Sequence, residues 1–277
     1  MDEPLPPGLY IVATPIGNLG DLTVRAADVL RRADLILAED KRVTAKLLAH
    51  IGATARMQAY HDHSSAADRE RVLGRLAGEA VALVSDAGTP LISDPGYKLV
   101  RAARAAGLPV HTLPGPSAAI AALTLAGLPT DRFLFAGFLP AKAKARAEVV
   151  TELAGLRATL VFYESGPRLA EALAALTDGL GPRDAAVVRE ISKLHEECVT
   201  GTLAQLAERY RETPPRGEIV IVVGPPAEAE PASAEDLDAA LRTALASQSA
   251  SRAAALVAEQ LGIPRKRAYA RALELSR

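Results

Sequence analysis

The feature that most constrains the fold is a set of three loops rich in glycine and proline, each of which directly follows a short apolar run. The loops are Thr14–Asn18, Ser85–Pro90 and Pro114–Ser117, after the apolar runs 9–13, 80–84 and 110–113. Glycine permits backbone conformations that are closed to other residues and proline fixes its own φ, so each loop predicts a sharp end to a strand. Parallel strands hold ligands at their carboxyl ends. We therefore expect the three loops to line one cleft.

The first half of the chain alternates short strand-like runs with helix-like segments. Strands are expected at 9–14, 35–39, 81–85 and 109–113, and helices at 22–32, 43–50, 66–77 and 96–106. Asp21 is a plausible N-cap of the first helix. Strands that alternate with helices of this length need crossover connections, so the sheet should be largely parallel and covered on both faces.

The second half differs because two of its strands follow each other without a helix. After a helix at 118–126, strands are expected at 132–138, 159–163, 185–191, 196–201 and 218–223, with helices at 144–153 and 169–176. The consecutive strands 185–191 and 196–201 favour antiparallel pairing, which makes this sheet mixed. We expect α/β domains at residues 1–114 and 115–226 with a crevice between them.

The end of the chain has a third character. A Pro, Ala and Glu stretch at 225–233 is typical of a linker, and helices are expected at 237–246, 252–261 and 265–275. Gly262-Ile263-Pro264 joins the last two helices with helix-turn-helix spacing. We expect residues 227–277 to form a linker and a small helical bundle. Its Arg265-Lys266-Arg267 either contacts RNA phosphates or forms a solvated helix end.

Composition limits the classes of function. The net charge is −1 and aromatic residues make up 4% of the 277 residues, so RNA would have to be held by local patches or by its shape. A single cysteine excludes an internal disulfide framework, and no apolar run is long enough for a membrane span. With no signal-peptide pattern at the N-terminus, we expect a cytoplasmic protein.

Common nucleotide motifs are missing from the sequence. No G-x-G-x-x-G follows the first strand and no G-x-x-x-x-G-K-[ST] occurs, which argues against dinucleotide binding and against NTP hydrolysis. His61 and His63 lie in a Tyr-His-Asp-His run, but five histidines without H-E-x-x-H do not support a metal site. We expect no metal there; the run is either a polar loop that binds substrate or a plain surface loop.

Two charged segments have both a functional and a structural interpretation. Glu39-Asp40-Lys41-Arg42 follows the second strand and either orients a substrate ribose or phosphate, or places carboxylates favourably at a helix N-terminus. Lys142, Lys144 and Arg146 lie on a loop and a helix start. Because cations are unfavourable at a helix N-terminus, they suggest contact with an anion.

These segments together resemble the tetrapyrrole methylase superfamily of S-adenosylmethionine-dependent enzymes, and within it a branch that methylates the ribose 2′-hydroxyl of a cytidine in the decoding region of small-subunit (16S) rRNA. The motifs that carry the resemblance are TPIGNL, LILAED, YHDH, ALVSDAGTPLISDPGY, LPGPSAAI, LPTDRFLFAGFLPAK, FYES and GEIVIVV. The resemblance implies a two-domain α/β fold with the cofactor in the interdomain cleft. Residues implied to contact S-adenosylmethionine are Pro15, Asp86, Ala87, Gly88, Thr89, Ser117, Ala118, Tyr163 and Gly217.

For the chemistry, we expect a protein that mainly aligns its reactants, helped by a base because a ribose hydroxyl is a poor nucleophile at neutral pH. Asp40 or Glu39 is the candidate proton acceptor, Lys41 or Arg42 the ribose-phosphate anchor. Further candidate RNA contacts are His61, His63, Lys142, Lys144 and Arg146. The expected partners are small-subunit rRNA or the assembled 30S subunit. The resemblance to the superfamily also suggests a homodimer.

Two rival functions share this cleft. A methyltransferase for a corrin precursor would need neither the C-terminal bundle nor the cations at 142–146, whereas both suit an RNA substrate. A non-catalytic RNA-binding protein would not bind S-adenosylmethionine at all.

Overall fold

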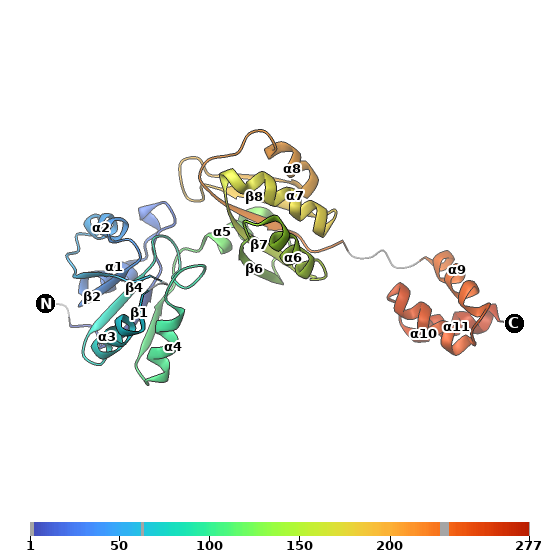
Figure 1. The fold of residues 1–277 in the computed structure, drawn as a ribbon, viewed down its shortest axis with the longest axis horizontal. Helices are drawn as coiled ribbons and strands as arrows, with labels where there is room; N and C mark the ends of the chain where they lie inside the picture. Colours follow the sequence, from blue (N-terminus) through green and yellow to red (C-terminus); the bar gives the residue numbers. More distant parts are fainter. Residues whose placement is uncertain (1–2, 62–63, 228–232, 277) are drawn as a thin grey trace. The chain divides into compact units, whose positions relative to one another are not determined.

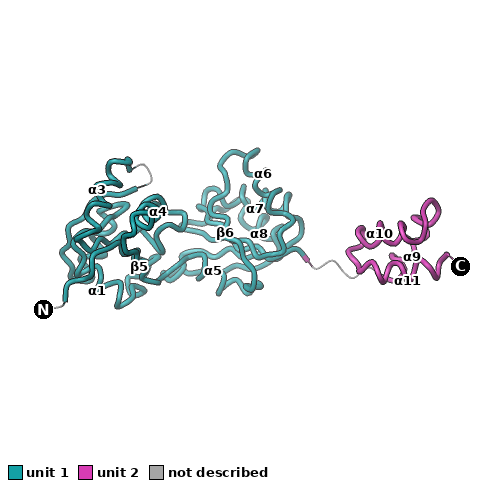
Figure 2. Tube along the Cα trace, turned by 90° about the horizontal axis from the view of Figure 1, so that it is seen from below, with its two compact units in different colours: residues 1–226 teal, residues 227–277 magenta. Residues whose placement is uncertain are grey.

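The computed structural model describes residues 3–61, 64–227 and 233–276. They form two compact units, residues 1–226 and 227–277 (Figure 2). Among the described residues, no helix is long and apolar enough to cross a membrane.

The first sheet consists, in the described chain, of five strands in the order β3-β2-β4-β1-β5, all parallel. The strands are β1 (Gly8–Val12), β2 (Leu35–Ala38), β3 (Met57–Ala59), β4 (Ala80–Val84) and β5 (Val110–Leu113). From β1 the chain crosses toward the β3 edge, but from β4 it crosses toward the β5 edge. The adjacent strands β1 and β4 therefore form the topological switch point, where open α/β sheets bind ligands.

Helices cover both faces of this sheet, as the sequence predicted (Figure 1). The helices are α1 (Val24–Arg32), α2 (Lys41–His50), α3 (Ala66–Leu76) and α4 (Tyr97–Ala105). Leu30 of α1 and Leu47 of α2 pack with Val12 on one face. Leu76 of α3 and Leu99 of α4 pack on the other. Successive residues of each strand pack alternately into two separate cores, one on each face of the sheet, which explains why these strands are apolar along their whole length.

The second sheet has the order β6-β7-β10-β8-β9 and is mixed, as expected. Its strands are β6 (Phe133–Phe138), β7 (Thr159–Ser165), β8 (Asp184–Arg189), β9 (Glu197–Thr202) and β10 (Glu218–Val223). β6 and β7 are parallel, and the other neighbours are antiparallel, including the consecutive strands β8 and β9. One face packs on α6 (Ala143–Leu153), α7 (Leu169–Leu180) and α8 (Leu203–Tyr210), the other on α5 (Ala118–Ala126).

The second unit is a bundle of α9 (Ala234–Leu245), α10 (Ala250–Leu261) and α11 (Arg265–Leu275). Its core is built from leucine, valine and alanine side chains, among them Leu241, Val257 and Ala268. Gly262 ends α10 with a φ of 62°, a left-handed conformation that suits glycine. Arg271 forms an ion pair with Asp238 at 2.6 Å and thereby ties α11 to α9.

One local prediction was wrong, and the elements β3 and α8 were not predicted. Asp21 does not cap α1, because it lies in the short 3₁₀ turn η1 (Leu19–Asp21) and Thr23 accepts the hydrogen bond from the Ala26 amide instead. β3 was not predicted, because it is short and only partly buried. The helix α8 was also missed, although Thr202 and Gln205 form a capping box at its start.

Candidate functional site

The three predicted loops meet at the carboxyl edge of the first sheet. Thr14 and Gly88 exchange backbone hydrogen bonds of 2.9 and 3.1 Å, which join the loops after β1 and β4. The Thr89 hydroxyl donates to the Pro116 carbonyl at 3.0 Å and joins the loop after β5. The loops therefore form one hydrogen-bonded cluster at the switch point.

Gly88 makes this cluster possible. Its φ of 79° lies in the left-handed region, and a Cβ at this position would lie 3.3 Å from Cγ2 of Ile16. Any other residue would be strained there and would push against the loop after β1.

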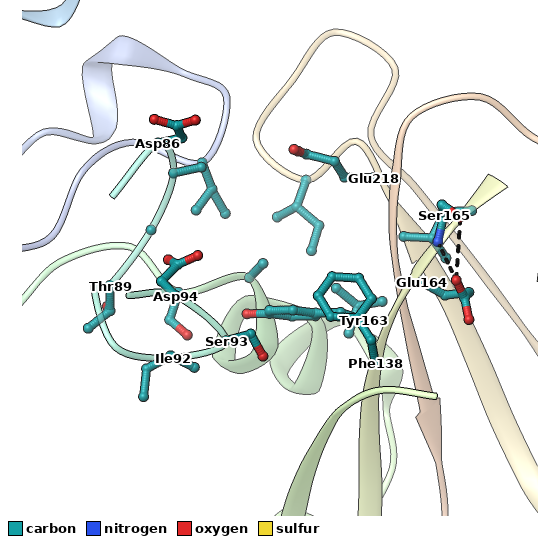
Figure 3. Close-up of a pocket in the computed structure, with 18 of the residues that line it drawn as sticks. Asp86, Thr89, Ile92, Ser93, Asp94, Phe138, Tyr163, Glu164, Ser165 and Glu218 are labelled. Atoms are coloured by element: carbon teal, nitrogen blue, oxygen red, sulfur yellow. Dashed lines mark hydrogen bonds between the residues drawn. The ribbon is translucent and has the colours of Figure 1, made fainter. Parts of the chain in front are cut away.

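A cavity of ≈ 370 Å³ opens beside the cluster, and we call it the first cavity. The loop residues of the first sheet meet strand residues of the second sheet around it (Figure 3). Its lining comprises Ile16, Glu39, Asp86, Ala87, Gly88, Thr89, Ile92, Ser93, Asp94, Ser117, Ala118, Phe138, Tyr163, Glu164, Ser165, Ile191, Gly217, Glu218, Ile219 and Val220.

The first cavity is acidic. Its described lining contains five carboxylates and no lysine, arginine or histidine. Glu164 is turned away, because one of its oxygens accepts from the Ser165 amide and the other lies 3.4 Å from Arg168 (Figure 3). Asp86 is held in place by the Asp40 amide, which donates to it at 2.9 Å. A cation is therefore the ligand that this lining would favour.

An aromatic group forms the wall from the second sheet. The Tyr163 ring meets Phe135 and Phe138 edge to face, with ring centres 4.7 and 5.7 Å apart. The Tyr163 hydroxyl accepts a hydrogen bond of 3.3 Å from the Ala119 amide in the first turn of α5. Burial raises the pKa of Tyr163 above its ordinary value, so the phenol is neutral at neutral pH.

Most residues predicted to contact a cofactor line the first cavity. They are Asp86, Ala87, Gly88, Thr89, Ser117, Ala118, Tyr163 and Gly217. Pro15 lines an adjoining cavity instead. Glu39, one of the two candidate proton acceptors, also lies in the first cavity.

The structure gives Asp40 a structural role. Asp40 is the N-cap of α2, where its carboxylate accepts from the Arg42 amide at 2.8 Å and pairs with the Arg42 guanidinium at 2.6 Å. Hydrogen bonds from Arg42 lower the pKa of Asp40 to about 2, which makes it a poor base at neutral pH. Lys41 and Arg42 are exposed and line neither cavity. Of the two interpretations of this segment, the helix entry fits Asp40, while the contacts of Lys41 and Arg42 with RNA stay predictions.

The other predicted RNA contacts that the structure describes do not line the first cavity. His61 follows β3 and its amide donates to the Ser64 hydroxyl, while His63 lies outside the described residues. Lys142 and Lys144 are exposed at the start of α6. Arg146 is 7% exposed, donates to the Pro140 and Ala141 carbonyls and lies 3.1 Å from Glu171. Its guanidinium therefore holds its own loop together, and we withdraw Arg146 as an RNA contact.

Sequence reasoning missed part of the lining. Ser93 and Asp94 belong to the motif LISDPGY, but the motif does not show that its loop turns back over the cavity. Leu91 and Ser93 have positive φ values of 74° and 61°, which are rare for residues other than glycine. Because neither residue is a glycine, the sequence did not indicate this turn of the backbone. Among the described residues, no group of three or more potential ligands is placed to hold a metal ion.

Comparison with known proteins identifies the family to which this chain belongs. The model of the family "Tetrapyrrole (Corrin/Porphyrin) Methylases" matches residues 8–207, and that of the "RsmI C-terminal HTH domain" matches residues 231–276. A protein of Erythrobacter litoralis named "Ribosomal RNA small subunit methyltransferase I" is 58% identical, over 99% of this chain and 97% of the relative. Its namesake from Mesorhizobium japonicum is 48% identical, over 99% of this chain and 94% of the relative.

A solved structure is similar over most of the chain. The uroporphyrin-III-C-methyltransferase of Thermus thermophilus covers 78% of this chain and 93% of its own, with a TM-score of 0.56 and 25% identity. Its sequence identity and its coverage of this chain are both lower than those of the two relatives above. The chain belongs to the tetrapyrrole methylase family and, within it, to the same family as the proteins named ribosomal RNA small subunit methyltransferase I.

Proposed function

We propose that this protein methylates the ribose 2′-hydroxyl of a cytidine in the decoding region of small-subunit rRNA. S-adenosylmethionine is the methyl donor of its family. The observation that carries the proposal is the acidic first cavity at the switch point of the first sheet. S-adenosylmethionine carries a sulfonium, an ammonium and one carboxylate, so its net charge is positive and a lining with carboxylates and no basic side chain suits it.

The proposed donor contacts divide by chemistry. Asp86 and Asp94 would offset the positive charges of the donor, while the aromatic wall at Tyr163 and Phe138 would pack on its apolar parts. The other proposed contacts are Ala87, Gly88, Thr89, Ser117, Ala118 and Gly217. S-adenosylmethionine supplies an activated methyl group on a positively charged leaving group.

Glu39 is the group we propose as proton acceptor. Glu39 lines the first cavity and directly follows β2. In the transfer, the ribose oxygen would bond to the methyl carbon as the bond from that carbon to sulfur breaks, and Glu39 would take the hydroxyl proton. The donor would supply a leaving group that departs with the electron pair as a neutral thioether.

The RNA substrate is supported by the relatives and by the second unit. The relatives that match nearly the whole chain bear an rRNA methyltransferase name. In the second unit, Arg265, Lys266 and Arg267 are exposed at the start of α11, where phosphates would meet them. The proposal also includes the finer details of the reaction: a cytidine as the modified nucleotide and its ribose as the methylated group. It further includes the assembled 30S subunit as substrate, a cytoplasmic location and a homodimer.

The test is methylation of a defined particle. The purified full-length protein would be incubated with labelled S-adenosylmethionine and 30S subunits from a strain that lacks this gene. Because 2′-O-methylation blocks alkaline cleavage of the adjacent phosphodiester, a hydrolysis ladder locates the product. We expect one protected cytidine in the decoding region.

The same preparation would be offered uroporphyrinogen III as the rival substrate, since the fold is shared with a uroporphyrin-III methyltransferase. Label in the porphyrinogen, or in a base of the rRNA, would contradict the proposal. Calorimetry with S-adenosylmethionine separates both enzymes from a non-catalytic RNA-binding protein, which would give no heat of binding.

A further inference from the structure

A second cavity of ≈ 300 Å³ adjoins the first cavity. It lies between the loop after β1, the helix α2 and the residues that follow β4, with Lys193 and Glu218 from the second sheet's part of the chain. Its lining comprises Thr14, Pro15, Ile16, Gly17, Leu19, Val43, Thr44, Lys46, Leu47, Ser85, Asp86, Ala87, Lys193 and Glu218.

The two cavities share a wall. Ile16, Asp86, Ala87 and Glu218 line both of them. A ligand in the second cavity therefore lies next to a donor in the first. This is the arrangement that direct transfer between two bound molecules requires, because the reacting atoms must approach within about 3–3.5 Å.

The second cavity differs from the first in charge and in apolar surface. Lys46 and Lys193 balance its two carboxylates, Asp86 and Glu218, whereas the first cavity has no cation in its described lining. Leu19 and Val43 are 42% and 39% exposed, which is high for large apolar side chains beside a cavity. The second cavity thus combines an apolar surface with a cation at its edge.

Lys193 is fixed, so Lys46 is the lysine left to meet a substrate. The Lys193 ammonium contacts Glu190 at 3.1 Å and Glu218 at 3.2 Å. Its stem lies on Gly17, where a Cβ would come within 2.3 Å of the lysine Cε. Lys46 is exposed on α2, one helical turn from Val43.

We propose that the second cavity receives the nucleotide that is methylated, taken out of the RNA stack. The base lies against Leu19 and Val43, a neighbouring phosphate meets Lys46, and the ribose lies at the shared wall. Enzymes that do chemistry on a base commonly extrude its nucleotide into a pocket and read it through stacking and hydrogen bonds, and we extend this mode of binding to an enzyme that acts on the ribose. The inference rests on the proposed function, because it assumes that RNA is the substrate.

Filling the second cavity tests the inference directly. Val43→Trp should occupy the space for the base, and Val24→Trp is the matched control, since Val24 is 86% exposed and lines neither cavity. We expect Val43→Trp to lower kcat/KM for 30S subunits at least about 10-fold, with the Kd for S-adenosylmethionine within about 2-fold of wild type. Val24→Trp should change neither quantity.

Salt dependence tests the lysine. Lys46→Gln should reduce the slope of log kcat/KM against log salt by about 0.7–0.9, the value of one lost phosphate contact. Lys98→Gln is the control, because Lys98 is exposed on α4 and lines neither cavity. A wild-type slope for Lys46→Gln would remove the phosphate contact from the inference.

The outcomes distinguish a failure of this inference from a failure of the proposed function. If wild-type protein methylates 30S subunits and Val43→Trp does so equally well, the nucleotide does not enter the second cavity and only this inference fails. If Val43→Trp loses donor binding to the same extent as activity, the cavities are not separate sites and the inference also fails. If wild-type protein binds S-adenosylmethionine but leaves 30S subunits unmethylated, the proposed function itself is wrong.

Discussion

The two sheets of the first unit contribute to the first cavity in different ways. The first sheet supplies loops beyond its strand ends, and these loops carry Asp86 and Asp94. The second sheet supplies residues within its strands, such as Tyr163 of β7 and Ile219 of β10. Loops are free of the hydrogen-bond ladder and can aim carboxylates inward, whereas strand residues are fixed by the pleat. The first sheet therefore supplies most of the charge, and the second supplies a rigid wall.

This difference predicts that loop variants alter chemistry or charge, and that strand variants alter fit. The largest effect should come from Glu39→Gln at the end of β2. Loss of a positioned proton acceptor costs about 10²–10⁴-fold in rate. We expect kcat to fall at least about 100-fold, measured by label transfer to 30S subunits under saturating substrates, while the Kd for S-adenosylmethionine changes little.

Asp40→Asn is the matched control for Glu39→Gln. Asn also caps helices well, and Asp40 lines neither cavity, so we expect kcat to stay within about 3-fold of wild type. If Asp40→Asn were the slower variant, the assignment of the proton acceptor to Glu39 would be reversed.

The next effect tests the backbone of the loop cluster. Gly88→Ala places a Cβ at a φ of 79° and 3.3 Å from Ile16, so the loop must shift. The left-handed conformation alone costs about 1–2 kcal/mol for a residue with a Cβ. We expect the Kd for S-adenosylmethionine to rise about 10-fold, as measured by calorimetry.

Gly107→Ala separates strain from position. Gly107 also has a positive φ, 70°, but an added Cβ would have nothing within 4 Å. This variant should lose some stability and keep its donor affinity. Equal weakening in both variants would mean that general destabilisation, not the loop cluster, controls donor binding.

The sequence was sufficient to predict the strand-and-helix order and the meeting of the three loops. The reason is physical, because glycine and proline restrict the backbone wherever they occur, and a parallel sheet brings strand ends to one edge. Of the elements that escaped prediction, β3 has a weak pattern because it is short and half-exposed, whereas α8 begins with a capping box that the prediction overlooked. The division of the first unit at residue 114 stays a prediction.

The roles of charged residues were harder to predict. Glu39 and Asp40 are neighbours, yet one lines the first cavity and the other caps a helix. Arg146 was predicted to contact an anion together with Lys142 and Lys144, but it is buried against its own loop. In each case the direction of the side chain depends on how the helix starts, and a residue pattern does not specify that. The second cavity also requires residues far apart in sequence, such as Val43 and Lys193.

The second sheet should show a smaller effect on fit. Tyr163→Phe removes the acceptor of the Ala119 amide while keeping the ring against Phe135. A hydrogen bond of this kind contributes about 0.5–1.5 kcal/mol, so we expect the Kd for S-adenosylmethionine to rise about 2- to 10-fold. Tyr210→Phe, in the core against α7 on the opposite face of the same sheet, should leave donor binding unchanged. An unchanged Kd for Tyr163→Phe would show that the wall acts through its ring alone.

The smallest effect concerns the structural role of Asp40. Arg42 lowers the pKa of Asp40 from 3.8 to about 2, so the folded state favours the charged carboxylate. This contribution to stability is fully present above about pH 5 and disappears as the pH falls through about 2. Asp40→Ala should therefore lower Tm by about 1–3 °C at pH 7, by a constant amount between pH 6 and 8. The difference from wild type should shrink below pH 4. A difference that instead grew toward acid would mean that the Asp40 carboxylate is not held by Arg42, and Asp40 would again compete with Glu39 as the proton acceptor.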